Sequence, residues 1–140
     1  MTDARNVFAY GSLMFPAVWN RVVQGDYRIS AATIHGFQRL RIRGEQYPAL
    51  IVNPDAGLLT GRVYFDVLAN DIARLDHFET SDYARVSIVV TVADEALAAD
   101  AYFTLKPEVL ERLEWSPEIF ESDGMEPFLA TYAATNAPPK

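Results

Sequence analysis

The chain contains no cysteine among its 140 residues. Disulfide bonds, thiolate ligands for a metal and a cysteine nucleophile are therefore excluded. Histidine is nearly absent as well, because His35 and His77 are the two in the sequence and lie far apart. Their separation is unlike the close spacing of histidines in zinc sites, so the sequence predicts no bound metal. We interpret His35 as structural and His77 as facing solvent.

Basic residues are also few. The chain has 12 Lys and Arg against 19 Asp and Glu, a net charge of -7 and a pI near 4.7. An acidic chain without basic clusters is a poor partner for nucleic acid or for an anionic membrane. No apolar run approaches the length of a membrane span. Residues 1–6 are polar and lack the apolar core of a secretion signal, so we expect a cytoplasmic protein.

The chain does contain enough apolar sequence for a core. Half of its residues are hydrophobic, and its length suits one domain spanning residues 1–140. We find no internal repeat or low-complexity block. Residues 137–140, at the end of a Pro-rich tail, are expected to be a frayed terminus.

Short strands dominate the first two thirds of the sequence, and helices cluster later. We expect strands at residues 6–10, 28–42 with a kink at Gly36, 50–52, 58–67, 86–92 and 99–105. Helices are expected at residues 16–23, 71–77 with Asn70 as cap, 107–113, from Ser116, and around 128–132. This order predicts an α+β fold with a small, mostly antiparallel β-barrel or curled sheet and short flanking helices.

Two details of this pattern are specific enough to test. The apolar run at residues 50–52 is separated from the strand at 58–67 by an Asn-Pro-Asp-Ala-Gly turn, which favours a hairpin. Arg39, Arg41 and Arg43 alternate along one predicted strand, so they fall on one face. We interpret that face as solvated.

The most informative segment is Phe-Ala-Tyr-Gly-Ser-Leu-Met at residues 8–14, where the first strand ends and a helix begins. Gly11 breaks the strand and Ser12 is suited to cap the next helix. Consecutive backbone N–H groups in such a turn can face one point and bind an anion without any basic side chain. The alternative is a simple strand-to-helix turn with no ligand.

A second motif, Leu-Asp-His-Phe-Glu-Thr-Ser-Asp-Tyr-Ala-Arg, occupies residues 75–85. We expect Glu79 in the loop between a helix and a strand, a frequent place for catalytic groups. If Glu79 faces an apolar pocket beside Phe78, burial raises its pKa towards neutrality, as general acid-base catalysis requires. The alternative is a solvated glutamate, the usual state of this residue type.

Together the two motifs resemble the γ-glutamylcyclotransferase-like superfamily, in its AIG2-like and γ-glutamylamine cyclotransferase branch. Between them Gly36-Phe37, Tyr47-Pro-Ala49 and Gly61-Arg-Val-Tyr64 resemble the family too, and the likeness runs from about residue 7 to about residue 105. One departure is Thr80, which stands where the family usually has glycine after the glutamate.

The resemblance implies a reaction that needs no metal or cofactor. The α-amine of a γ-glutamyl substrate attacks its own γ-carbonyl, giving 5-oxoproline and a free amine. Glu79 is then the general acid and base, because one carboxylate can take a proton and later return it. The implied substrate-binding residues are Tyr10, Gly11, Ser12, Leu13 and Tyr83. For Tyr10 the alternative is a core tyrosine, and for Tyr83 it is a packing role.

Three hypotheses remain at this stage. The first is a cyclotransferase acting on a small γ-glutamyl amine or γ-glutamyl amino acid. The second, suggested by Thr80, is a binding or regulatory module that keeps the cavity for an amino-carboxylate ligand without the chemistry. The third applies the same ring closure to a γ-glutamyl protecting group in a biosynthetic pathway. Arg85 is expected to be structural, paired with Asp76 or Asp82, while Trp115 and Phe120 are candidates for the pocket rim.

Overall fold

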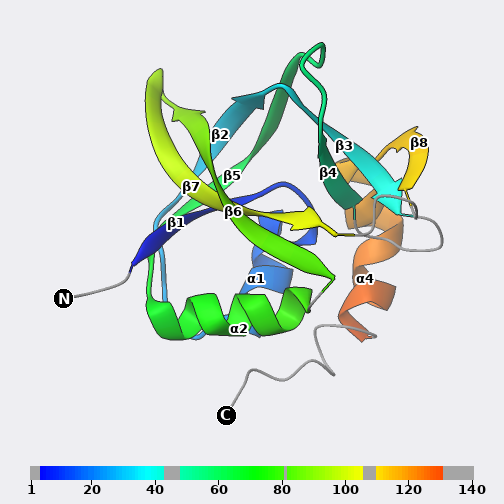
Figure 1. Cartoon of the computed structure of the whole chain (residues 1–140). Helices are drawn as coiled ribbons and strands as arrows, with labels where there is room; N and C mark the ends of the chain where they lie inside the picture. The colour runs from blue at the N-terminus through cyan, green and yellow to red at the C-terminus, as the bar shows by residue number, and fades with distance from the viewer. Residues whose placement is uncertain (1–3, 43–47, 81, 106–109, 131–140) are drawn as a thin grey trace.

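The computed structural model describes residues 4–42, 48–80, 82–105 and 110–130, and its strands form two sheets (Figure 1). Five strands close into a barrel in the order β1-β5-β2-β6-β7. They are β1 (Arg5–Ala9), β2 (Ile29–His35), β5 (Leu58–Val67), β6 (Tyr83–Val92) and β7 (Glu95–Thr104). The barrel pairs are antiparallel except β1 with β7. The predicted α+β class with a small, mostly antiparallel barrel is therefore confirmed.

A three-stranded sheet, β4-β3-β8, lies beside the barrel. Its strands are β3 (Phe37–Ile42), β4 (Pro48–Val52) and β8 (Leu110–Glu114). The kink predicted at Gly36 marks the passage from β2 in the barrel to β3 in this second sheet. Gly36 has a φ of +82°, a left-handed conformation that favours glycine and allows the sharp change of direction.

Two groups of helices accompany the sheets. The first is the 3₁₀ turn η1 (Ser12–Met14), α1 (Pro16–Val22) and α2 (Ala69–Glu79). The second is a continuous helical stretch of α3 (Pro117–Ile119), the π-helical turn η3 (Phe120–Gly124) and α4 (Met125–Phe128). Ser116 caps this stretch, as predicted, by accepting a hydrogen bond from the Ile119 N–H at 3.2 Å. In Figure 1, α1 and α2 lie below the barrel and α4 stands beside them.

Two of the predicted elements are wrong. The hairpin between residues 50–52 and 58–67 does not form, because β4 pairs with β3 whereas β5 pairs with β1 and β2. A short apolar run fixes its own strand character but not its partner. The helix predicted at 107–113 is contradicted at residues 110–113, which lie in β8 against β3. Residues 106–109 lie outside the described residues, as does the predicted tail at 137–140.

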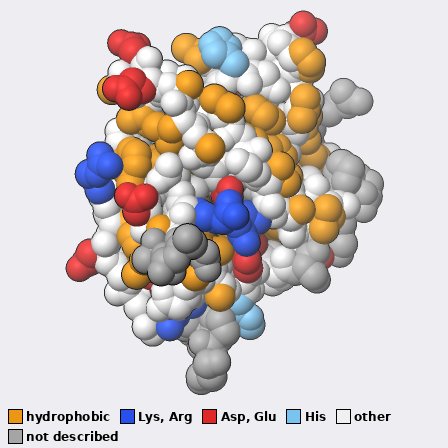
Figure 2. Space-filling view, turned by 60° about the vertical axis from the view of Figure 1, so that its left-hand side comes forward, with side chains coloured by type: hydrophobic (Ala, Val, Ile, Leu, Met, Phe, Trp, Pro, Cys, Tyr) orange, Lys and Arg blue, Asp and Glu red, His pale blue; other side chains and the backbone are white. Residues whose placement is uncertain are grey.

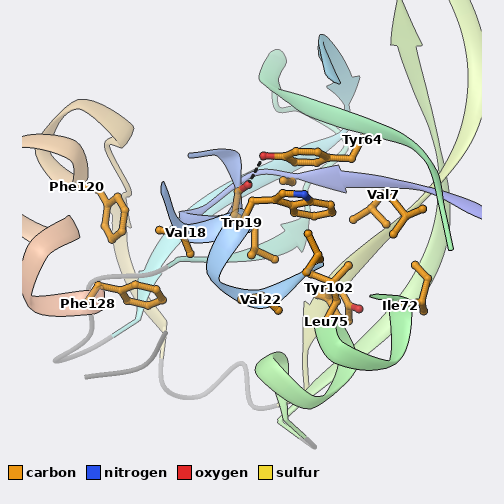
Figure 3. Close-up of a cluster of buried hydrophobic side chains, with 14 of the residues drawn as sticks. Val7, Val18, Trp19, Val22, Tyr64, Ile72, Leu75, Tyr102, Phe120 and Phe128 are labelled. Atoms are coloured by element: carbon orange, nitrogen blue, oxygen red, sulfur yellow. Dashed lines mark hydrogen bonds between the residues drawn. The ribbon is translucent and has the colours of Figure 1, made fainter. Parts of the chain in front are cut away.

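The largest core cluster fills the space between the barrel and the helices (Figure 3). Trp19 of α1 stacks on Tyr64 of β5, with the ring centroids 3.5 Å apart and the planes 3° from parallel. Leu75 of α2 and Val7 of β1 are completely buried in the same cluster. Phe120 and Phe128 belong to it as well, so the C-terminal helical stretch is anchored in the core. Within the described ranges no helix is long and apolar enough to cross a bilayer.

Helix α2 begins earlier than predicted. Its first residue is Ala69 and Leu68 precedes it, so Asn70 is not the cap. Asp71, in the first turn, is buried rather than solvated. Its carboxylate accepts hydrogen bonds from four groups: Gln24 N at 3.0 Å, Gly25 N at 2.9 Å, Tyr27 OH at 2.6 Å and Arg74 Nη1 at 2.9 Å. This carboxylate thus joins α2 to the loop that follows α1.

Candidate active site

A cavity of about 250 Å³ opens where the end of β1 meets the end of α2. Residues far apart in sequence surround it. Its wall consists of Phe8, Ala9, Tyr10, Gly11, Ser12, Leu13, Pro48, Phe78, Glu79, Thr80, Asp82, Tyr83, Tyr102 and Phe128. All six residues that the sequence proposed for the site, Glu79, Tyr10, Gly11, Ser12, Leu13 and Tyr83, are in this wall. The structure therefore brings the two sequence motifs together around one space.

The turn after β1 is held tightly from behind. The carbonyl of Tyr10 accepts a hydrogen bond from Arg39 Nη1 at 2.9 Å, and that of Leu13 accepts one from the Tyr64 hydroxyl at 2.7 Å (Figure 3 draws the second). Gly11 packs against Pro48: a Cβ on it would lie 2.7 Å from Pro48 Cδ, closer than non-bonded carbons approach. The turn is thus fixed on both sides.

Two backbone N–H groups of this turn, those of Ser12 and Leu13, are candidates for binding a ligand. Among the described residues, no backbone or side-chain group accepts a hydrogen bond from either of them. Both residues line the cavity and both are buried. Buried backbone N–H groups normally have a partner. The arrangement suits an acceptor on a ligand, such as a carboxylate.

Arg39 corrects the prediction of a solvated arginine face. Its guanidinium is half-buried, donates to Tyr10 and lies over the Trp115 ring at 5.2 Å from the ring centroid. Burial, opposed by the charges of Glu114 and Glu118, lowers its pKa from the ordinary value. Arg41 is exposed as predicted, and Arg43 lies outside the described residues. Alternation places residues on one face of a strand but does not say what covers that face.

Glu79 is the last residue of α2, not a loop residue as the sequence suggested. Part of its surface opens to the cavity, while surrounding protein desolvates its carboxyl group. Burial is the largest cause that raises the pKa of Glu79, and the charge of Asp76 adds to it, giving a pKa of about 8. Near neutral pH the carboxyl group can therefore both hold and release a proton.

The tyrosines of the cavity are partly structural. Tyr10 lines the cavity and its hydroxyl donates to the Tyr102 carbonyl, so it is also a core tyrosine with a satisfied hydroxyl. Burial first, and then the charge of Glu79, raise the pKa of Tyr10. Tyr83 donates over a long 3.5 Å to the Pro48 carbonyl. Both phenols thus line the same cavity as Glu79.

Thr80 keeps the backbone conformation that glycine favours. Its φ of 69° and ψ of -176° lie in a region that is strained for a β-branched residue. Its N–H donates to the Asp76 carbonyl at 3.0 Å, which ends α2, and its Oγ1 accepts from the Asp82 N–H at 3.3 Å. With threonine at this position, α2 still ends directly after Glu79.

We expect Thr80→Gly to stabilise the protein. Relief of strain of about 1–3 kcal/mol, less about 0.5–1 kcal/mol for glycine's backbone entropy, leaves a net gain of about 1 kcal/mol. Chemical denaturation measures the free energy of unfolding. Thr80→Ala is the matched control, because it keeps the Cβ and therefore the strain while removing the Oγ1 acceptor. Equal stability of the glycine and alanine variants would contradict the strain at this position.

Several residues of the site carried no signal in the sequence. Phe128 of α4 lines the cavity and packs edge-on against Phe78, with ring centroids 6.1 Å apart. Trp115 and Phe120, the candidates for the rim, are instead buried in the core. Tyr102, also in the wall, belongs to a run of buried residues in β7, where nothing in the local sequence distinguishes it.

The remaining expectations concern charged groups. Arg85 pairs with Asp76, one of the two partners proposed for it, with Nε 3.0 Å from Oδ1. His77 is exposed, in agreement with its assignment to the solvent side of the helix. Among the described residues, no three His, Asp or Glu side chains are grouped so as to hold a metal ion.

Comparison with known proteins places the chain in a family. The profile of the family described as "Gamma-glutamyl cyclotransferase, AIG2-like" matches residues 7–121. AIG2-like protein A of Arabidopsis thaliana is 32% identical over 132 residues, which cover 91% of this chain and 78% of that protein. The likeness therefore extends well past the two motifs.

Solved structures with the same fold are also known. A solution structure of an Arabidopsis thaliana protein superposes with a TM-score of 0.70 at 28% identity, covering 96% of this chain and 84% of that one. A structure titled "Gamma-glutamyl cyclotransferase" gives a TM-score of 0.64 at 14% identity, covering 99% and 90% of the two chains, a likeness of fold. The chain belongs to the AIG2-like gamma-glutamyl cyclotransferase family, which confirms the resemblance seen in its sequence.

Proposed function

We propose that this protein is a cyclotransferase that releases 5-oxoproline and a free amine from a γ-glutamyl amine or γ-glutamyl amino acid. The nucleophile is the substrate's own α-amine, so the enzyme needs no nucleophilic side chain. Its tasks are to fold the substrate so that the amine reaches the γ-carbonyl and to move protons.

The observation that carries the proposal is Glu79 in the cavity wall with a pKa raised to about 8. The ionised carboxylate takes a proton from the substrate's ammonium as the amine attacks the carbonyl. The same group, now protonated, gives the proton to the leaving nitrogen as the γ-amide bond breaks. A pKa near the working pH suits a group that does both.

The turn at Gly11, Ser12 and Leu13 is suited to hold the other end of the substrate. Its N–H groups at Ser12 and Leu13 have no acceptor among the described residues, and its carbonyls are fixed by Arg39 and Tyr64. A substrate α-carboxylate would accept from these N–H groups without a basic side chain. Tyr10 and Tyr83 would then flank the glutamyl chain between the turn and Glu79.

The alternative, a binding module without chemistry, rested on Thr80. Because Thr80 adopts the left-handed backbone of the usual glycine, the end of α2 is not redirected away from the cavity. This favours the enzyme over the module.

The test is a product assay. The purified protein is incubated with γ-glutamyl amines, γ-glutamyl amino acids and ε-(γ-glutamyl)lysine, and 5-oxoproline is followed by mass spectrometry. Release of 5-oxoproline with an equimolar amine supports the cyclotransferase and identifies the amine. Thermal stabilisation by these compounds without any product would support the binding module instead.

The turn can be tested separately through Gly11. We expect Gly11→Ala to lower kcat/KM by about 10–100-fold, because the new Cβ meets rigid Pro48 and a displaced turn no longer aligns the substrate. Gly57→Ala is the matched control, since a Cβ there meets nothing within 4 Å. Steady-state kinetics on the best substrate measure the effect. Unchanged kinetics for Gly11→Ala would show that the turn does not position the substrate.

A further inference from the structure

A second carboxylate lies one helical turn before Glu79. Asp76 and Glu79 are three residues apart on α2, and residues at this spacing are neighbours on the helix surface. Asp76 is held by two partners from the barrel. The Tyr102 hydroxyl donates to its Oδ1 at 2.6 Å, and Arg85 donates from Nε to Oδ1 at 3.0 Å and from Nη2 to Oδ2 at 3.4 Å.

Arg85 is itself fixed on its other side. Its Nη1 donates to Oδ2 of Asp100 at 2.7 Å, and that carboxylate is buried in β7. Arg5 lies 3.5 Å from the same oxygen. Figure 2 shows Lys or Arg side chains (blue) lying against Asp or Glu side chains (red) near the centre of one face of the molecule. The position of Asp76 is therefore determined by a network that joins α2 to two barrel strands.

The groups that face Glu79 come from four parts of the fold. Tyr10, Tyr83 and Tyr102 line the cavity from the end of β1, from β6 and from β7, and Asp82 lines it from the segment before β6. Of the charged groups around Glu79, Asp76 is the one whose charge acts on it most, after burial, and it raises the pKa of Glu79. Arg85 pairs with Asp76 but is not part of the cavity wall.

We propose that Asp76, held by Arg85 and Tyr102 one helical turn before Glu79, is a positioning residue that disfavours the ionised form of Glu79. Asp76 acts through Glu79 and does not touch the substrate. The catalytic meaning of this inference rests on the proposed function, because a shifted protonation of Glu79 changes turnover if Glu79 is the acid and base. Arg85 limits the effect by partly neutralising Asp76.

The variant that tests this is Asp76→Asn, which removes the charge and keeps the shape and an acceptor for Tyr102 and Arg85. Protonation of Glu79 is followed by ¹³C NMR of the glutamate side-chain carboxyls, with the signal assigned by its loss in Glu79→Gln. We expect the titration midpoint of Glu79 to move down by about one pH unit in Asp76→Asn. The pH profile of kcat/KM is expected to move by the same amount.

Arg85→Gln is expected to shift the titration midpoint of Glu79 in the opposite direction. Without the guanidinium the charge of Asp76 is uncompensated, so the midpoint of Glu79 is expected to move up. The two variants remove opposite charges of one ion pair, so midpoints that move in opposite directions cannot be explained by loss of structure. If Arg85→Gln does not fold because the buried Asp100 loses its 2.7 Å ion pair with Arg85, Asp76→Asn decides alone. Asp55→Asn, an exposed carboxylate outside the cavity, controls for net charge.

The measurements distinguish failure of the role proposed for Asp76 from failure of the proposed function. A Glu79 midpoint that is the same in Asp76→Asn as in the unaltered protein overturns the role of Asp76, whether or not the protein is active. A midpoint that moves in a protein that releases no 5-oxoproline supports the role of Asp76 and rejects the proposed function.

Discussion

Glu79→Gln is expected to lower kcat for release of 5-oxoproline by about 10³-fold, the range of general acid-base catalysis. The glutamine amide has nearly the size and shape of the carboxyl group, but it neither takes a proton from the ammonium nor gives one to the leaving nitrogen. Since the glutamine leaves the Gly11–Leu13 turn untouched, KM is expected to change little. Steady-state kinetics with mass-spectrometric detection of the product measure both constants.

Loss of activity must be separated from loss of fold. Burial of the carboxyl group raises the pKa of Glu79 in the folded protein to about 8, above its ordinary value of 4.5. A raised pKa means that the folded state binds more protons between these values, so stability falls as pH rises from about 4.5 to about 8. The amide of the glutamine variant does not titrate. Glu79→Gln should therefore be at least as stable as the unaltered protein, with an advantage in Tm that grows across this range.

The kinetics of product release and the pH dependence of Tm together separate a catalytic role of Glu79 from a structural one. If the Tm advantage of Glu79→Gln increases with pH, ionisation of Glu79 destabilises the folded protein. If the same variant is inactive, the reaction requires that ionisable carboxyl group. A variant that retains full activity would remove Glu79 from the mechanism, and the search for the base would turn to Asp82, another carboxylate in the cavity wall.

The same pKa gives the expected pH dependence of the reaction. Because the ionised carboxylate is the base for ring closure, kcat/KM should rise with pH and approach a plateau above about 8. A profile measured between about pH 5 and about pH 10 checks this. A rise centred near pH 4.5, the ordinary glutamate value, would mean that Glu79 is solvated in the working enzyme.

The sequence pointed to six residues of the cavity wall but not to the distant residues that hold them in place. Gly11 and Glu79 lie in local patterns, a strand followed by a turn and a helix that ends at a new strand, and such patterns survive in a single sequence. Arg39 and Tyr64 hold the turn through contacts across 29 and 51 residues. Phe128 reaches the cavity from the C-terminal helical stretch. Periodicity indicates which face of an element a side chain occupies, but not which distant backbone carbonyl it meets.

In the fold too, local patterns were predicted from the sequence and distant pairings were not. The strands predicted at 86–92 and 99–105 lie within β6 and β7 except for Leu105, and these two strands pair through a turn with left-handed residues at Ala93 and Asp94. The five-residue strands β4 and β8 pair with β3. The strand predicted at 50–52 formed as part of β4, but its predicted hairpin partner and the helix predicted over β8 were wrong. Pairing of short strands is decided by the sheet edge that they meet, which local propensity does not encode.

Asp71→Ala is expected to cause the largest loss of stability among the changes considered. The carboxylate is 1% exposed and accepts four hydrogen bonds, two of them from backbone N–H groups. Alanine leaves these donors unsatisfied and the buried part of Arg74 without its anion. Breaking a buried, hydrogen-bonded ion pair from one side costs about 3–5 kcal/mol, or about 10–17 °C in Tm for a chain of this size. Thermal and chemical denaturation near neutral pH measure the loss.

Asp26→Ala is the matched control, because Asp26 belongs to the same loop and is exposed. A change within about 0.5 kcal/mol is expected there. If the two alanine variants were equally stable, the Asp71 contacts would contribute nothing net to folding.

The pH dependence of stability tests the charge of the same carboxylate. Burial alone would raise the pKa of Asp71, but the hydrogen bond from Tyr27, followed by those from Gln24, Gly25 and Arg74, outweighs burial and lowers it below the ordinary 3.8. A lowered pKa contributes stability above pH 3.8 that is lost as pH falls through the folded-state value. The gap between the unaltered protein and Asp71→Ala should therefore be widest near neutral pH and narrow in acid. A gap that stayed constant down to the acid transition would mean that packing, rather than the charge of Asp71, joins α2 to the loop after α1.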